Sequence, residues 1–233
     1  MKNIFFKITV AVVSLLISNS VFAFNYNVYT GFGFSYINSK GLNKITDGLD
    51  QGYVTSFGKI HFPLNFEGVF AFGFDRSKVG LGLGYEFTSR NSSSDVYSIT
   101  QSVNYKSIPV FAMYRYTYFK TLKWEISSGA SVGIVYSKLS MRTSPSVQEN
   151  ETFGMKSWGY TLCGDTDVSY ALSENVRLFS SLGLRYAKTG SFSYSSDTSK
   201  HSKGEKVLFS DGSNLTLNLS GLKFLVGIML NWG

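Results

Sequence analysis

Large apolar residues alternate strictly with small or polar ones in several stretches of this chain. Between residues 26 and 36, aromatic and other large side chains hold most even positions, whereas Asn27, Gly31, Gly33 and Ser35 hold odd ones. A period of two residues is typical of a β-strand whose two faces meet different surroundings. The pattern predicts an all-β chain whose strands each have an apolar face and a small, polar face.

The same alternation recurs along the rest of the chain. Further runs lie at 66–74, 79–88, 108–118, 124–136, 158–170, 176–186 and 222–232. Leu215, Leu217 and Leu219 break the parity of the last run, which predicts a bulge or a strand end near Ser220. With the opening run this makes eight strands, an even number, as a closed antiparallel barrel of the outer-membrane type requires.

The connections between the runs alternate between long and short. The expected long connections, rich in Ser, Asn, Lys and Gly, cover residues 38–65, 89–102, 138–156 and 188–213. The short ones lie around 75–77, 120–123 and 173–175. Outer-membrane barrels have this asymmetry, with long loops outside the cell and tight turns in the periplasm.

The size of the apolar side chains decides which face points outward. Aromatic residues make up 16% of the chain, and an eight-stranded barrel encloses only enough space for a modest set of side chains. Turned outward, the same residues form a band against lipid, with Tyr and Trp at its edges. We therefore predict an eight-stranded antiparallel up-and-down transmembrane β-barrel, and a soluble ligand-carrying barrel is the alternative.

The amino-terminal segment has the features of a secretory signal peptide. Lys2 and Lys7 flank an apolar run over 8–17, and Val21-Phe22-Ala23 follows with small residues at the cleavage positions. We expect cleavage after Ala23, so that 1–23 is the signal and 24–233 the barrel domain. The single cysteine excludes a disulfide scaffold, and the aromatic content argues against disorder.

Charged residues fall on the face that we assign to the lumen. Acids and bases nearly cancel there, which predicts a buried salt-bridge network, because an unpaired buried charge is costly. The residues expected in it are Glu67, Glu86, Arg115, Glu125, Asp165, Asp167, Arg177, Arg185 and Lys223. Asp165 and Asp167 are expected to pair with Arg177 or Arg185 on the next strand. An ion pathway, or a cation at the two aspartates, is the alternative.

The predicted loops carry an excess of basic residues. The residues singled out are Lys138, Arg142, Lys156, Lys188, Lys200, Lys203 and Lys206. Basic groups just above a lipid band are placed to contact lipopolysaccharide phosphates or another ligand. The alternative is a solvated surface with incidental positive charge. Export makes nucleic acid an unsuitable partner for this basic chain, despite its net charge of +7.

Catalytic chemistry has little support in the sequence. The two histidines, His61 and His201, both fall in predicted loops, and the stretch 193–206 around His201 is hydrophilic, without apolar surface for a lipid chain. No cysteine or histidine has metal-ligand spacing. We therefore expect no enzyme activity, cofactor or metal, and a lipid-modifying enzyme is the lesser alternative.

Taken together, these segments resemble the bacterial outer-membrane β-barrel domain family, which includes small opacity-protein-like and Ail/Lom-like surface proteins. The resemblance rests on the signal peptide, the aromatic opening strand Asn25–Ile37, the segment Ser107–Tyr116 and the alternating last strand. Chains of this family usually end on an aromatic residue, whereas here Trp232 is followed by Gly233. No residue-level site carries over.

The resemblance implies a role as well as a fold. It implies a surface protein of the outer membrane whose loops bind host surfaces, complement factors or extracellular matrix. We expect a monomer that acts in adhesion or envelope interaction through its loops, with a side-chain-filled barrel. The alternative is a narrow porin-like channel for small solutes or ions.

Overall fold

The structure is a computed structural model, which describes residues 25–37, 62–94, 99–145, 151–197, 201–209 and 212–232. The predicted signal peptide (1–23) and most of the first predicted loop (38–61) lie outside the described residues. No helix in the described part of the chain is long and apolar enough to span a membrane.

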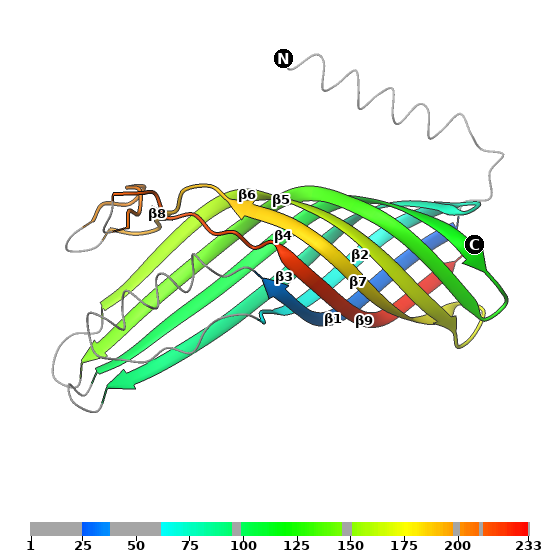
Figure 1. The fold of residues 1–233 in the computed structure, drawn as a ribbon, viewed down its shortest axis with the longest axis horizontal. Helices are drawn as coiled ribbons and strands as arrows, with labels where there is room; N and C mark the ends of the chain where they lie inside the picture. The colour runs from blue at the N-terminus through cyan, green and yellow to red at the C-terminus, as the bar shows by residue number, and fades with distance from the viewer. Residues whose placement is uncertain are drawn as a thin grey trace, which may run out of the picture.

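The described strands form one closed antiparallel barrel (Figure 1). From β1 to β7 each strand pairs with the next one along the chain, β7 pairs with β9, and β1 closes the barrel by pairing with β9. The short strand β8 pairs with the outer end of β6 and forms a bridge to Lys206. The predicted eight-stranded barrel is therefore confirmed. Its eight strands are β1 (Asn25–Ile37), β2 (Leu64–Phe74), β3 (Ser77–Ser94), β4 (Ile99–Lys120), β5 (Trp124–Pro145), β6 (Glu151–Ala171), β7 (Val176–Thr189) and β9 (Gly221–Trp232). The two-residue strand β8 (Ser193–Tyr194) is not part of the closed ring.

The short connections lie where the sequence predicts them. Residues 75–76, 121–123 and 172–175 join β2 to β3, β4 to β5 and β6 to β7. Asp75 takes a positive φ of 52°, which Asp tolerates better than most side chains. β9 begins at Gly221, in agreement with the predicted break near Ser220.

The aromatic face of the barrel points outward. Phe32, Phe72 and Leu83 are 59%, 43% and 56% exposed, whereas Glu86 and Arg115 on the opposite face are 1% and 8% exposed. Neighbouring rings pack along this surface, for example Trp124 against Tyr170 with centroids 4.8 Å apart. An exposed belt of this kind suits hydrocarbon and not water. The soluble barrel is therefore the wrong alternative.

Two of the predicted loops are largely strand, so that part of the loop prediction is wrong. β3 continues to Ser94 and β4 begins at Ile99, while β5 runs to Pro145 and β6 starts at Glu151. In Figure 1 these strands extend well past β1 and β9. We call residues 99–107, 137–145 and 151–157 the extension. Outside lipid, a paired strand no longer needs an apolar outer face, so the outward alternation stops although the ladder continues.

The segment after β7 covers the inner face of the extension. We call the described residues 190–197, 201–209 and 212–220 the cap. Its backbone is tied by hydrogen bonds such as Val207 N to Phe192 O (2.9 Å) and Leu215 N to Val207 O (2.9 Å). Phe192, Leu217 and Leu219 are buried against the extension in one apolar cluster with Val103, Tyr105, Leu139 and Met155. The stretch 193–206, which was predicted to be hydrophilic, contributes only the partly buried Tyr194 to this cluster, and the buried apolar residues of the cap flank it.

Candidate functional site

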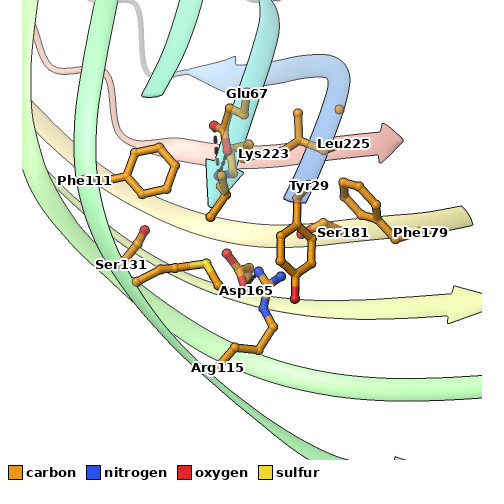
Figure 2. A pocket seen from close by; sticks show the side chains of 13 residues that line it. Tyr29, Glu67, Phe111, Arg115, Ser131, Asp165, Phe179, Ser181, Lys223 and Leu225 are labelled. Atoms are coloured by element: carbon orange, nitrogen blue, oxygen red, sulfur yellow. Dashed lines mark hydrogen bonds and ion pairs between the residues drawn. The ribbon is translucent and has the colours of Figure 1, made fainter. Parts of the chain in front are cut away.

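The lumen of the barrel is crossed by buried ion pairs. Arg115 on β4 binds both Asp165 and Asp167 on β6, with its Nη2 2.7 Å from Asp165 Oδ1. Figure 2 shows Arg115 and Asp165 pointing toward each other across the interior. The side chains of these three residues are at most 9% exposed. A guanidinium held between two carboxylates ties β4 to β6 across the strand that separates them.

A glycine on the intervening strand makes this contact possible. In the ladder, Arg115 lies opposite Gly129 of β5, and Gly129 lies opposite Asp165. A Cβ at Gly129 would come within 2.5 Å of the Tyr114 carbonyl oxygen and 3.3 Å of Arg115 Cβ. The absence of a side chain at this position lets Arg115 lie flat over β5 and reach the aspartates.

Three further ion pairs lie in the lumen. Lys223 Nζ lies 3.1 Å from both carboxylate oxygens of Glu67. Arg185 pairs with Glu86, which also accepts a hydrogen bond from Ser107 Oγ at 2.9 Å. Nearer the short turns, Lys78 pairs with Glu125, whose Oε1 accepts from Thr117 Oγ1 at 3.1 Å. All these charged side chains are at most 12% exposed.

The observed partners of two lumen aspartates differ from those that the sequence predicts. Asp165 and Asp167 pair with Arg115, so the expected partners Arg177 and Arg185 are wrong. The reason is register, because Asp165 and Arg115 both lie opposite Gly129. Arg177 instead donates to Ser169 Oγ at 3.1 Å and to the Lys123 carbonyl at 3.2 Å.

Lys78 is a lumen residue that the sequence reasoning missed. It is the second residue of β3, and its side chain pairs inside the barrel with Glu125. The parity of β3 places Lys78 on the same face as Gly80 and Glu86, and this was the signal that could have identified it. With Lys78 included, five acids face five bases in the lumen.

Apolar side chains fill the space between the ion pairs. Tyr29, Phe111, Met113, Phe179 and Met229 form a buried cluster inside the membrane belt. A Cβ at Gly82 would lie 2.4 Å from the Phe111 ring, and one at Gly227 would lie 2.8 Å from the Phe179 ring. The inward-facing glycines therefore leave space in the lumen for aromatic rings and arginine side chains.

A small cavity remains at the centre of the lumen. It measures about 30 Å³ and is lined by the residues shown in Figure 2, among them Tyr29, Glu67, Arg115 and Lys223. A water molecule needs roughly 10–15 Å³ measured in this way, so the cavity has room for about two. Arg115 lines the cavity, and its Nε is buried without a protein partner; such polar groups are the usual partners of interior water.

The basic residues at the outer end of the barrel lie on the extension, on β7 and on the cap. Lys138 and Lys156 share a single row on the outer face of the extension, and Arg142 lies further out on β5. Lys188 lies opposite Tyr160 instead, and Lys203 and Lys206 are exposed on the cap. Lys200 lies outside the described residues. Lys106, which the sequence reasoning did not single out, lies directly opposite Lys138.

His201 lies on the cap among residues that orient it. Its ring stacks on Tyr194 with centroids 4.3 Å apart, and Nδ1 lies 3.4 Å from the Glu205 carboxylate. A hydrogen bond from the backbone N–H of Ser202 and the nearby His201 hold the pKa of Glu205 below its usual value. Burial, and then the charge of Glu205, raise the pKa of Tyr194.

The described residues contain no group of three or more His, Cys, Asp or Glu side chains placed to hold a metal ion. Asp165 and Asp167, the predicted alternative cation site, both contact the Arg115 guanidinium. A positive charge bound between the two carboxylates already neutralises much of the field that would attract a cation.

Comparison with known proteins gives the fold but no near relative. No protein-family model and no curated protein sequence matches the chain. Among solved structures, a major outer membrane protein from Thermus thermophilus aligns over 90% of this chain and 100% of its own, with 14% identity and a TM-score of 0.57. The outer membrane protein OprG from Pseudomonas aeruginosa aligns over 91% and 97%, with 14% identity and a TM-score of 0.50.

A third solved structure that aligns is Ail, the attachment invasion locus protein of Yersinia pestis, in complex with the heparin analogue sucrose octasulfate. The alignment covers 90% of this chain and 99% of Ail, with 11% identity and a TM-score of 0.43. Identities this low report architecture and not activity. The chain has the fold of the small eight-stranded outer-membrane barrels, and its exposed aromatic belt locates it in a bacterial outer membrane.

Proposed function

We propose that this protein is a monomeric surface-recognition protein whose barrel is an anchor and whose extension and cap contact ligands outside the cell. The observation that carries the proposal is the division of the molecule into a filled interior and an elaborated outer end. The lumen holds four sets of ion pairs and an apolar cluster. Its central cavity measures about 30 Å³, which is the space of about two water molecules.

The outer end is built as a stable platform. Residues of β4, β5, β6 and the cap bury one another in an apolar cluster that includes Tyr105, Leu139, Phe192 and Leu217. Such packing holds the backbone in one arrangement, and binding to a preorganised surface loses less conformational entropy than binding to a flexible loop. A rigid, largely polar outer surface favours adhesion or envelope interaction over transport.

The channel alternative predicts a different measurement. A pore must offer ions a hydrated path, whereas desolvated ion pairs in a narrow lumen resist passage. Purified protein in a planar bilayer should give no sustained single-channel currents. Reproducible currents would contradict the proposal if they pass through the barrel. To test this, a cysteine-directed blocker is added to a Ser193→Cys variant, where it should abolish such currents from the outer end.

The lipid-modifying enzyme remains the lesser alternative. His201 is stacked on Tyr194 and faces Glu205 at the cap surface, an arrangement that suits a structural contact. The phosphate, sugar and acyl composition of lipid A from cells producing wild type or His201→Ala protein should be identical. A difference between the two would favour the enzyme.

Recognition itself is tested on whole cells. Cells displaying the wild-type chain should adhere to at least one member of a panel of immobilised extracellular-matrix proteins and heparin more strongly than cells with an empty vector. Lys203→Glu, Lys206→Glu and Leu208→Ser together alter the exposed face of the cap. This variant should lose most of that adhesion at equal surface display.

A matched control changes the opposite end of the barrel. Arg76→Glu, Lys120→Glu and Lys123→Glu alter exposed residues at the short turns, which face the periplasm, and should leave adhesion unchanged. Adhesion equal to the empty-vector value across the whole panel, or equal loss in both variants, would contradict a recognition role for the cap.

A further inference from the structure

Three lysines form a continuous row on the outer face of the extension. The ladder places Lys106 of β4 directly opposite Lys138 of β5, and Lys138 directly opposite Lys156 of β6. All three share the outward parity of their strands. Lys106 and Lys138 are exposed, and Lys156 is half-buried.

This register concentrates positive charge. Side chains directly opposite each other in an antiparallel pair have Cβ atoms about 5 Å apart, and like charges at that distance destabilise the sheet. Within the described residues, no acidic side chain forms an ion pair with any of the three lysines. The fold therefore tolerates a repulsive arrangement that an external anion would relieve.

The row lies at the edge of the membrane belt. The next outward row toward the membrane is Ile108, Tyr136 and Trp158, and the rings of Tyr136 and Trp158 pack with centroids 5.0 Å apart. Trp and Tyr mark the interface between hydrocarbon and headgroups. The next row away from the membrane is Asn104, Ser140 and Gly154, which is polar or small. The lysine ammonium groups therefore reach the depth of lipid headgroups.

We propose that Lys106, Lys138 and Lys156 form a binding site for the phosphate groups of an outer-leaflet lipid headgroup. The row covers two strand spacings and therefore spans about 10 Å. This is wide enough for the three lysines to contact more than one phosphate group. Lysine binds phosphate as a point charge and needs no fixed fork geometry. The site deepens the proposed function because it names a partner in the cell envelope. It rests on the proposed function in one respect, namely that the extension faces the outside of the cell.

The test uses the full chain in two surroundings. In an uncharged maltoside detergent without phosphate, Lys106→Gln, Lys138→Gln and Lys156→Gln together should leave the midpoint of thermal unfolding unchanged or raise it, because repulsion is removed. In nanodiscs of phosphatidylcholine with bisphosphorylated lipid A, the same variant should unfold at a lower temperature than wild type. A residue needed only for packing would lower the midpoint in both surroundings.

Lipid retention gives the second readout. Native mass spectrometry should show lipid A bound to wild type with at least about tenfold higher affinity than to the triple glutamine variant, since each lysine near an anionic surface contributes on the order of a factor of five. A triple arginine variant at the same positions should retain binding. A control with Arg76→Gln, Lys120→Gln and Lys123→Gln removes equal charge at the other end and should bind lipid A as wild type does.

The outcomes separate the sources of phosphate. Equal retention of lipid A by wild type and the glutamine variant would overturn the site. Lysine-dependent binding of inorganic phosphate or heparin in phosphatidylcholine discs, with no added affinity for lipid A, would overturn the assignment to a lipid headgroup. Neither result depends on cell adhesion, so failure of this site and failure of the recognition role are distinguishable.

Discussion

Three strands, β4, β5 and β6, carry most of their apolar side chains on opposite faces in two regions of the molecule. Within the membrane belt, their outer face carries residues such as Val110, Ile134 and Leu162. Their inner face is mostly charged, small and polar, with Phe111 and Met113 as its large apolar members. In the extension, the inner face is apolar, with Tyr105 and Leu139 1% and 0% exposed, and the outer face is polar. The hydrophobic side of a continuous strand therefore changes where it leaves the bilayer.

The change occurs within two adjacent rows. The inward row Ser107, Ser137 and Ser157 is buried and polar, and the next inward row outside it holds Tyr105, Leu139 and Met155. On the outer face, the aromatic row of Tyr136 and Trp158 gives way to the lysine row. The surrounding medium sets which face is apolar, because lipid favours an apolar exterior and water an apolar interior.

The largest expected effect tests the charged interior of the belt. Arg115→Met leaves Asp165 and Asp167 buried without their shared cation, and breaking a buried pair from one side costs about 3–5 kcal/mol. The free energy of unfolding in detergent, measured from the change in gel mobility between folded and heated protein at increasing urea, should fall by that amount. Lys120→Met, at an exposed position on the same strand, should change it by less than about 0.5 kcal/mol. A stable Arg115→Met protein would show that the pairs are dispensable.

The apolar interior of the extension should respond to loss of volume. Leu217 is 1% exposed in the cap, and truncating a buried leucine to alanine costs about 2–5 kcal/mol. Leu217→Ala should increase amide exchange and protease cleavage within the cap while the barrel keeps its heat-modifiable mobility. Leu208→Ala, at a cap residue that is 57% exposed, should behave as wild type does. Loss of the whole barrel in Leu217→Ala would mean that the two regions unfold as one unit.

The contrast between the outer faces can be tested with one substitution at two depths. Leu83→Arg places a charge on the lipid-facing belt, where arginine near the bilayer midplane costs about 2–4 kcal/mol. Ser140→Arg places it on the outer face of the extension, where the cost should be near zero. Folding yield and unfolding free energy in lipid vesicles should fall only for Leu83→Arg. Equal effects would place the membrane boundary further out along β5.

The smallest expected effect concerns the pH response of the cap. Because the pKa of Glu205 is held below its usual value, by Ser202 and then His201, its ionised form stabilises the folded cap. That contribution is complete above the unfolded-state pKa near 4.5 and is lost as pH falls through the lower folded-state pKa. In wild type, the amide exchange rate of residues 201–207, corrected for intrinsic rates, should be higher at pH 3 than at pH 6. Glu205→Gln should lose this additional rise, and an unchanged response would assign it to another group.

Much of the fold could be predicted because lipid imposes a simple rule on each strand separately. The parity of Phe32, Phe72 and Leu83 was sufficient to place them outside, and that of Glu86 and Arg115 to place them inside. The extension was missed because the reasoning followed outward apolar residues only. Val103, Tyr105 and Leu139 continue the alternation with opposite parity, as do Leu215, Leu217 and Leu219, whose break in parity marks the cap.

The face on which each side chain lies follows from the order of residues along a strand, since period two is a local property. Which side chains on a face become neighbours follows from the way in which the strands pair. The pairing of Arg115 with Asp165 and Asp167, and the row of Lys106, Lys138 and Lys156, depend on the stagger between strands. Stagger follows from closing the whole barrel, and the sequence of a single strand carries no record of it.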